Sequence, residues 1–184
     1  MWELRSPQPV KLIIGILAAK DAHLGAARET LATEFGSFDL VSDSWLFNQT
    51  TYYKDQTGPR LLRQFVTIEQ LIDPGDLADC KHRTNRIEQE LSQTLDSAFP
   101  RPVNLDPGII EPSKLILAST KNFSHCIYIG KKMYAEVTLV FDKGTWRRLP
   151  YTYPDYLQLP YLEFFSEVKA KLLRQLKSAT HDKR

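Results

Sequence analysis

The sequence predicts one α+β domain: a ferredoxin-like βαββαβ core, an appended antiparallel β meander and a C-terminal helix. Up to about residue 110, strand and helix patterns follow the order β-α-β-β-α-β of the split βαβ motif. Shorter strand patterns separated by turns come next, and a helical pattern ends the chain. With 184 residues, 42% hydrophobic and 25% charged, the chain has the size and composition of one globular domain, frayed at about 1–8 and 178–184.

The first half of the core begins with a buried strand. Residues 11–18 (KLIIGILA) are a continuous apolar run rich in β-branched side chains, which is typical of a strand covered on both faces. Asp21 is expected to cap the helix that follows, and Gly36 to end it, because these residue types favour those positions. Aromatic residues and Val41 predict a second strand over 38–47.

The second half of the core has a longer helix. A polar loop over 48–60 leads to a third strand at 61–68 (LLRQFVTI). The sequence Asp-Pro-Gly-Asp at 73–76 predicts a helix start, since proline suits the first turn and acidic side chains suit the positive end of the helix dipole. Apolar spacing extends this helix to about Phe99. A short strand is expected over 102–110, interrupted at its Asp-Pro-Gly sequence.

Residues 111–122 are compatible with either a helix or a strand. Pro112 at a first-turn position, with Lys121 and Asn122 at the far end, favours a helix. The run Leu-Ile-Leu-Ala at 115–118 would also suit a strand. The helix is the preferred interpretation.

The last third of the chain predicts a hairpin, one more strand and a helix. The hairpin covers 125–141 and turns at Gly130, because glycine suits tight turns. A second turn at 142–144 leads to a strand over 145–149. After an aromatic loop, Pro160 opens the last amphipathic helix.

Charge and compartment signals exclude several classes of protein. The 24 basic and 22 acidic side chains leave a net charge of +2, divided between a slightly acidic first half and a basic second half. This balance gives no strong sign of nucleic-acid binding and none of membrane binding. We expect a cytoplasmic protein, because there is no signal peptide and the longest apolar run is far shorter than the roughly 20 residues that span a bilayer.

No familiar cofactor or metal motif is present. The P-loop pattern fails, since Gly15 is not followed by a glycine-lysine pair and Gly130 has His125 where the first glycine should stand. Cys80 and Cys126 lack the spacing of a zinc site or disulfide framework and are predicted to be small, mostly buried side chains. The sequence predicts no metal site and indicates no particular cofactor.

Glu136 is the first candidate functional residue. Two-residue periodicity places Tyr134, Glu136 and Thr138 on one face of a strand over 133–141, with the apolar side chains on the other. If that face is covered, the carboxylate needs a partner or a ligand, because a lone buried charge is costly. A solvated outer face would make the glutamate ordinary.

Other polar residues near Glu136 in sequence extend this candidate site. Asn104 and Asp106 point the same way on a strand, and Asp106 is either a ligand or general base, or the cap of a turn. Lys114, Lys121 and His125 could bind a phosphate or carboxylate, although a histidine at the start of a strand is often structural.

Two further groups are candidates for ligand contacts. Lys81, Asn85 and Glu88 share one stripe of the long helix, either holding an anion or forming a solvated flank. An aromatic edge could stack a base or could pack the final helix onto the sheet. This edge comprises Trp146, Tyr151, Tyr153 and Tyr156.

Together these residues predict a site for a small anionic ligand, such as a nucleotide. The alternative is a non-enzymatic module that binds RNA or a protein. Catalysis is left open, as is the oligomeric state. The candidate catalytic residues are Glu136, Asp106 and His125, and the candidate ligand-binding residues are Lys81, Asn85, Glu88, Asn104, Lys114, Lys121 and Tyr153.

The chain also contains a series of segments with a family likeness. In order, they are PVKLIIGILA (9–18), TYYKDQTGP (51–59), LIDPGDLADCKHRTNRIE (71–88), NLDPG (104–108), LASTKN (117–122), IYIG and YAEVTL (within 127–139) and YTYPDY (151–156). Over nearly the whole chain these segments resemble the bacterial family called domain of unknown function 4416. Its members are often labelled GTP-binding proteins, which implies nucleotide binding without a P-loop. Cys126 departs from the resemblance, where a basic residue is expected after the histidine.

Overall fold

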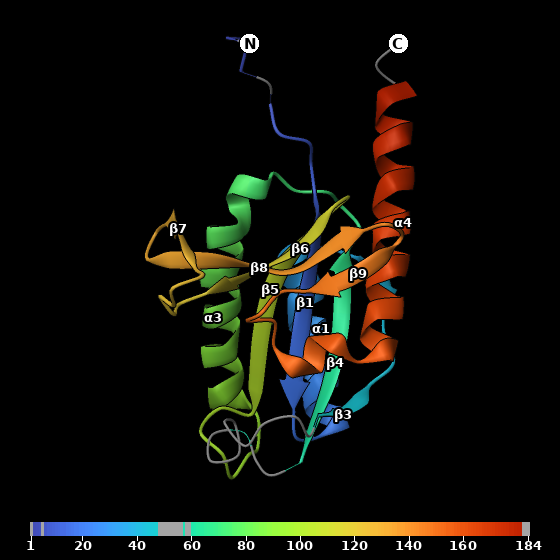
Figure 1. Cartoon of the computed structure of the whole chain (residues 1–184). Coiled ribbons are helices and arrows are strands. Elements are labelled where there is room, and N and C mark those ends of the chain that lie inside the picture. Colours follow the sequence, from blue (N-terminus) through green and yellow to red (C-terminus); the bar gives the residue numbers. More distant parts are fainter. Residues whose placement is uncertain (1, 5, 48–56, 58–59, 182–184) are drawn as a thin grey trace.

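A large antiparallel sheet organises the described part of the chain, which comprises residues 2–4, 6–47, 57 and 60–181 of the computed structural model (Figure 1). The strands are β1 (Lys11–Ala18), β2 (Phe38–Val41), β3 (Trp45–Phe47), β4 (Leu61–Ile68), β5 (Val103–Glu111), β6 (Lys114–Ser119), β7 (Ile127–Gly130), β8 (Met133–Asp142) and β9 (Thr145–Arg148). The helices are α1 (Asp21–Phe35), α3 (Leu77–Thr94) and α4 (Leu159–His181), with short 3-10 turns η1 (Pro74–Asp76) and η2 (Pro154–Leu157).

The strands pair in the order β2-β4-β1-β5-β6-β8-β7, while β3 also pairs with β4 and β9 with β8. Every pairing between these named strands is antiparallel. The predicted α+β class is therefore confirmed, with a mostly antiparallel sheet and three α-helices among the described residues.

Helices cover both faces of the sheet, which explains why β1 is apolar along its whole length. Leu12, Ile14 and Ile16 pack with residues of α1 and α3 on one face. Ile13 packs on the opposite face with residues of α4. Because side chains alternate along a strand, a strand buried on both faces loses the polar half of its pattern. None of the helices in the described part of the chain has both the length and the apolar character needed to cross a membrane.

The preferred helix at 111–122 is wrong, because β6 occupies Lys114–Ser119. Pro112 lies in the turn between β5 and β6, where its fixed φ serves the turn rather than a helix start. Leu115 and Leu117 bury their side chains in the core beneath α4. Pairing with β5 and β8 and burial on that face override the local helix signals.

Several boundaries also differ from the prediction. The expected strand at 38–47 is divided into β2 and β3, and between them the Ser42 hydroxyl accepts a 2.9 Å hydrogen bond from the Phe65 backbone N–H. Asp21 is the first helical residue rather than a cap, whereas Gly36 does end α1, with a φ of 98°. The long helix ends at Thr94, before the predicted Phe99.

A bulge in β8 changes its expected alternation. The register with β6 shifts between the pairs Leu115–Leu139 and Ile116–Val137, so Thr138 is the extra residue. Leu139 therefore lies in the core beneath α4, and not on the face that it was predicted to share with the preceding apolar residues.

The sheet splits between β5 and β6, and this split positions the candidate site. The two strands pair from Glu111 back to Gly108, and no pairing continues toward Val103. The expected interruption of β5 at its Asp-Pro-Gly sequence is wrong, since β5 continues through it. Pro107, however, has no N–H to donate, and it lies where the pairing with β6 ends.

Candidate functional site

A cavity of about 540 Å³ occupies the split between β5 and β6. Small-molecule sites commonly have volumes of about 300–1,000 Å³ and are lined by apolar walls with a few polar groups. Lys81 reaches the cavity from α3 on one face of the sheet, while Tyr153 and Asp155 reach it from η2 and the segment before it. The charged residues of the lining are Arg63, Lys81, Arg101, Asp106, Lys121, Glu136 and Asp155.

Arg63 links two acidic residues of the lining. Its Nη1 donates to Asp106 Oδ2 at 3.0 Å and its Nη2 to Asp155 Oδ2 at 3.4 Å. The guanidinium carbon also lies 5.2 Å from the centre of the Phe47 ring. Burial alone would lower the pKa of Arg63, but Tyr156 and the two carboxylates raise it above its ordinary value. Arg63 is therefore a fixed buried cation.

The pKa values of the two carboxylates paired with Arg63 are shifted in opposite directions. Burial alone would raise the pKa of Asp106, but Arg63, and then Lys81, lower it below its ordinary value. Burial raises the pKa of Asp155, and Arg63 only partly offsets this. Pairs of acids with pKa values displaced in opposite directions are typical of acid–base sites.

Asn104 brings a donor that has no partner among the described residues. Its side chain is 2% exposed, and its Nδ2 is buried without a hydrogen bond. The same amide is a side-chain donor toward Asp106 that helps to lower the pKa of that carboxyl, after the larger effects of burial, Arg63 and Lys81, but the contact lies outside normal hydrogen-bond geometry. The two residues come from the same face of β5, as the sequence predicted.

Lys81 and Glu88 bind the same residue of β5 where β6 has departed. Lys81 Nζ donates to the Leu105 carbonyl at 2.8 Å, and the Leu105 N–H donates to Glu88 Oε1 at 2.6 Å. Arg101 donates to the other carboxylate oxygen of Glu88 at 2.6 Å. Burial raises the pKa of Glu88, and Lys81 and Arg101 partly offset this rise. These α3 side chains therefore replace the missing strand as hydrogen-bond partners.

His125 and Glu136 meet at the wall of the cavity formed by β8. Glu136 Oε2 lies 3.0 Å from His125 Nε2, and Glu136 Oε1 accepts a 3.1 Å hydrogen bond from Thr138. The Glu136 side chain is 1% exposed. Nearby, burial raises the pKa of Tyr153 to about 12, with further contributions from Glu136 and Asp106. Glu136 thus has the partner that the sequence argument required on a covered face.

The structure brings most of the predicted site residues together, but not all. Asp106, Glu136, Asn104, Lys81, Lys121 and Tyr153 line the cavity. His125 and Glu88 contact lining residues. Lys114 pairs with Glu111 at 2.7 Å, at the end of β6 away from the split, and neither Lys114 nor Asn85 lines the cavity.

A known family covers most of the chain. The family model described as domain of unknown function (DUF4416) matches residues 8–172. The chain belongs to this family. No curated protein is similar enough to the chain to count as a match. The DUF4416 description assigns no activity.

Sequence reasoning missed Arg63, Arg101 and Asp155 in this member of DUF4416. Arg63 had a usable signal, because it is a charged residue within an otherwise mostly apolar strand. Asp155 lies within the predicted aromatic loop, and nothing in its local pattern distinguishes it from a turn residue. The loop at 48–60, apart from Thr57 and Arg60, lies outside the described residues.

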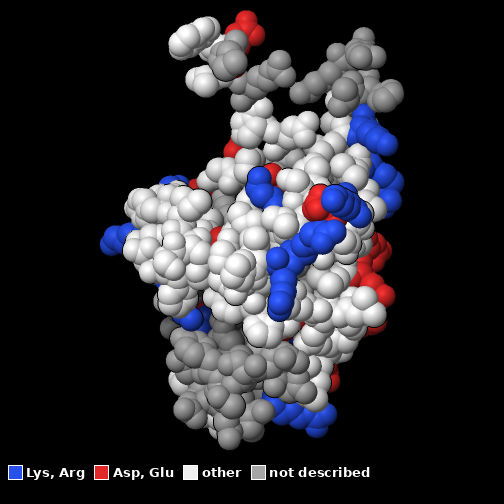
Figure 2. Space-filling model, in the orientation of Figure 1, with Lys and Arg blue, Asp and Glu red and all other residues white. Residues whose placement is uncertain are grey.

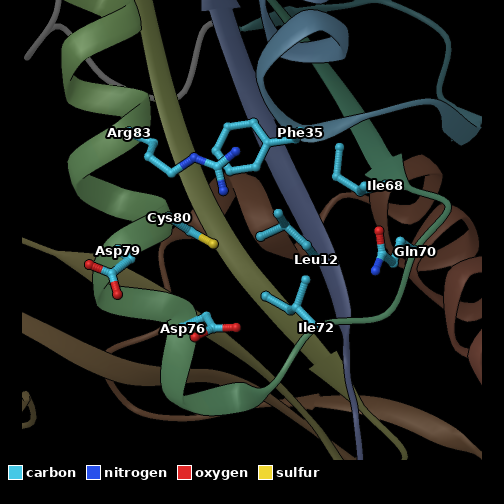
Figure 3. Close-up of a pocket in the computed structure, with 9 residues that line it drawn as sticks. All are labelled: Leu12, Phe35, Ile68, Gln70, Ile72, Asp76, Asp79, Cys80 and Arg83. Carbon is cyan, nitrogen blue, oxygen red and sulfur yellow. The ribbon is translucent and has the colours of Figure 1, made fainter.

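A second cavity, of about 450 Å³, lies between α3 and the face of the sheet that α1 and α3 cover (Figure 3). It is lined by apolar side chains of the core together with Asp76, Asp79, Cys80 and Arg83. Burial raises the pKa of the Cys80 thiol to about 11. A thiol of this kind stays protonated at neutral pH and is a poor nucleophile. This cavity contains none of the predicted site residues.

Proposed function

We propose that the cavity at the split binds a small anionic ligand, such as the phosphate of a nucleotide, without a P-loop. The observation that carries the proposal is the buried Nδ2 of Asn104, which lies beside the Asp106 carboxylate but makes no hydrogen bond of normal geometry with the described residues. A buried donor left without a partner costs about 1–3 kcal/mol, so it favours a bound acceptor. Arg63 also lines the cavity, and its buried Nε makes no hydrogen bond of normal geometry with the described residues.

The charges of the lining support an anion rather than a cation. The four basic residues exceed the three acidic ones. Asp106 and Asp155 are paired with Arg63, and Glu136 is paired with His125. Among the basic residues, Arg101 is paired with Glu88, which lies outside the lining, and Lys81 donates to the Leu105 carbonyl. Asn104 and the basic side chains of the cavity lining could donate hydrogen bonds to the phosphate or carboxylate oxygens of a ligand.

Aromatic side chains support a ligand that also has a flat ring. Phe123 and Tyr153 line the cavity and are 46% and 39% exposed. Lys121 lies 5.9 Å from the centre of the Phe123 ring, so a cation and a stacking surface occur side by side. Base stacking on aromatic rings is a common way of holding a nucleotide.

The cavity also offers groups for acid–base chemistry. Asp106, which has a lowered pKa, is the candidate general base, and Glu136, oriented by His125, is a second carboxylate on the opposite wall. Asp155, whose pKa is raised, is a candidate proton donor that the sequence did not indicate. These roles depend on the ligand and are secondary to binding.

The experiment is a thermal-shift panel followed by calorimetric titration. The probes are inorganic phosphate, pyrophosphate, GMP and GTP, with wild type and two variants, Asn104→Asp and Lys121→Met. Lys114→Met is the matched control, because Lys114 is a lysine at the other end of β6 that does not line the cavity. We expect at least one probe to raise the melting temperature of wild type and of the control. The Kd of that probe should be about 10-fold or more higher for N104D than for wild type, as expected for loss of a hydrogen bond to a charged group.

The proposal is contradicted by a panel in which no probe binds wild type, or by equal Kd values in wild type and N104D. RNA binding is the other outcome to examine. Figure 2 shows a group of basic side chains on one face, and Arg147 and Arg148 of β9 are exposed. Salt-dependent binding of generic RNA that survives N104D would favour the RNA-binding module instead.

We also propose that residues 11–111 form a ferredoxin-like core. Within the sheet, the strands β2-β4-β1-β5 are adjacent in an order that a split βαβ motif produces, and the connections after β1 and β4 contain α1 and α3. Both helices pack on the same face. These features support a ferredoxin-like core over residues 11–111, to which β6 to β9 add further strands.

A further inference from the structure

Three possible metal ligands come together beside the cavity. A nitrogen of His125, the sulfur of Cys126 and a carboxylate oxygen of Glu136 all lie within 4.8 Å of one another. A tight turn produces this arrangement, because the Cys126 N–H donates to the Phe123 carbonyl at 2.9 Å. The turn brings two neighbouring residues before β7 against the middle of β8.

The cluster is held in place by contacts that do not involve a metal. The His125 ring stacks on Tyr151, with centroids 4.1 Å apart and planes 12° from parallel. Thr138 donates to the Glu136 oxygen that does not face His125. Restrained ligands with supporting hydrogen bonds are characteristic of metal sites, where such contacts fix the orientation of the ligands.

We propose that His125, Cys126 and Glu136 bind a zinc ion. An imidazole, a thiolate and a carboxylate are zinc ligands, whereas Mg²⁺ and Ca²⁺ prefer oxygen ligands alone. In a tetrahedral zinc site, neighbouring N and O ligands lie about 3.3 Å apart. The 3.0 Å between His125 Nε2 and Glu136 Oε2 is close to that spacing.

The buried carboxylate of Glu136 favours a cation at this cluster, although the cavity lining as a whole has more basic than acidic residues. The Glu136 carboxylate is almost fully buried, and the side chains that it pairs or hydrogen-bonds with among the described residues are those of His125 and Thr138. A divalent ion would compensate this charge, and the Cys126 thiol would release its proton on binding. Three protein ligands leave the fourth position for water or a ligand. Because Glu136 lines the cavity, that position would lie beside it.

The inference does not depend on the proposed anion site, and its test is separate. Tag-free, chelator-treated full-length protein is titrated with Co²⁺, a spectroscopic substitute for zinc, and then with Zn²⁺. We expect one equivalent of Co²⁺ to bind with visible d–d bands and a near-ultraviolet thiolate-to-cobalt charge-transfer band. One equivalent of Zn²⁺ should displace it. Absence of these bands in wild type would overturn the proposal.

Two variants and a matched control locate the ion. Cys126→Ser should lose the charge-transfer band, while Cys80→Ala, which removes the buried thiol of the other cavity, should keep it. Thr138→Val should keep the band but weaken Co²⁺ binding about 10-fold, as for loss of a supporting hydrogen bond. An unchanged band in C126S would overturn the proposal. Near-ultraviolet circular dichroism of each variant checks that it is folded.

Discussion

Arg63 on β4 and Asp106 on β5 form a 3.0 Å ion pair across β1, the strand that lies between theirs. The pair passes over Gly15, whose register partners are Phe65 on β4 and Asp106 on β5. A Cβ atom on Gly15 would lie 2.8 Å from Arg63 Nη1 and 3.1 Å from the Phe65 ring. The glycine in the predicted strand KLIIGILA thus makes room for the charged pair that forms one wall of the cavity.

Replacing this glycine should displace the arginine. Gly15→Ala is expected to lower the free energy of unfolding by about 1–3 kcal/mol, because an added methyl group in a packed interior forces its neighbours to move. Gly25→Ala is the control, since its Cβ would approach Arg28 only at 4.0 Å, and alanine in a helix should stabilise by up to about 1 kcal/mol. Urea unfolding measures both. Equal effects of the two substitutions would contradict this role of Gly15.

The lowered pKa of Asp106 predicts how stability depends on pH. Because its folded-state pKa lies below its unfolded value, ionised Asp106 stabilises the fold above the unfolded pKa. That contribution is lost as the pH falls through the folded pKa. Asp106→Asn should cost about 2 kcal/mol at pH 7, and its deficit relative to wild type should shrink below about pH 4.

Asp155 gives the opposite expectation on the same arginine. Its pKa is raised by burial, so wild type should gain stability relative to Asp155→Asn as the pH falls through the folded pKa. Urea unfolding from pH 7 to pH 2 compares the two variants. If the stability differences of D106N and D155N from wild type changed with pH in the same direction, the pKa values of the two carboxylates would not be shifted in opposite directions.

Glu88 should be needed for the split in the sheet. Glu88→Leu leaves the Leu105 N–H and Arg101 without their acceptor and should destabilise by about 3 kcal/mol. Glu88→Gln keeps an oxygen that can accept from the Leu105 N–H, so it should lower the free energy of unfolding by less than Glu88→Leu does. Glu90→Gln, at an exposed position of the same helix, should stay within about 0.5 kcal/mol of wild type. Equal loss in E88L and E90Q would contradict the role assigned to Glu88.

The two cysteines should differ in reactivity. The pKa of Cys80 is raised to about 11, and its side chain is 2% exposed, whereas Cys126 is half-buried. In native metal-free protein at pH 7.5, iodoacetamide should modify Cys126 and leave Cys80 intact until the chain is unfolded. Peptide mass spectrometry measures both. Modification of Cys80 at a rate equal to that of Cys126 would contradict the burial described here.

Local patterns predicted the elements whose burial follows their own periodicity. β4 occupies the predicted residues 61–68, and β1 the predicted 11–18. The helix predicted over residues 111–122 was wrong because the strand conformation of β6 depends on pairing with its neighbours β5 and β8. A local sequence pattern does not contain that information. The bulge at Thr138 likewise depends on the pairing with β6.

Part of the candidate site was predictable where polar residues interrupt apolar patterns. Glu136 and Asp106 were found in this way, and the cavity lies between them. The split was not predictable, because the backbone groups of Leu105 hydrogen-bond to the side chains of Lys81 and Glu88 and not to a neighbouring strand. Nor was the meeting of Asp155 with Arg63, which are 92 residues apart in the chain.

The central claim is that an anion binds at the Asn104 amide, and the most direct measurement is an NMR titration of that amide. The side-chain NH₂ pair of Asn104, assigned by its loss in N104D, is followed while pyrophosphate or GTP is added to wild type. We predict a saturable change in its chemical shifts, with the same Kd as calorimetry gives. An Asn104 NH₂ pair that stays unchanged while the ligand binds elsewhere, or with no binding at all, would contradict the claim.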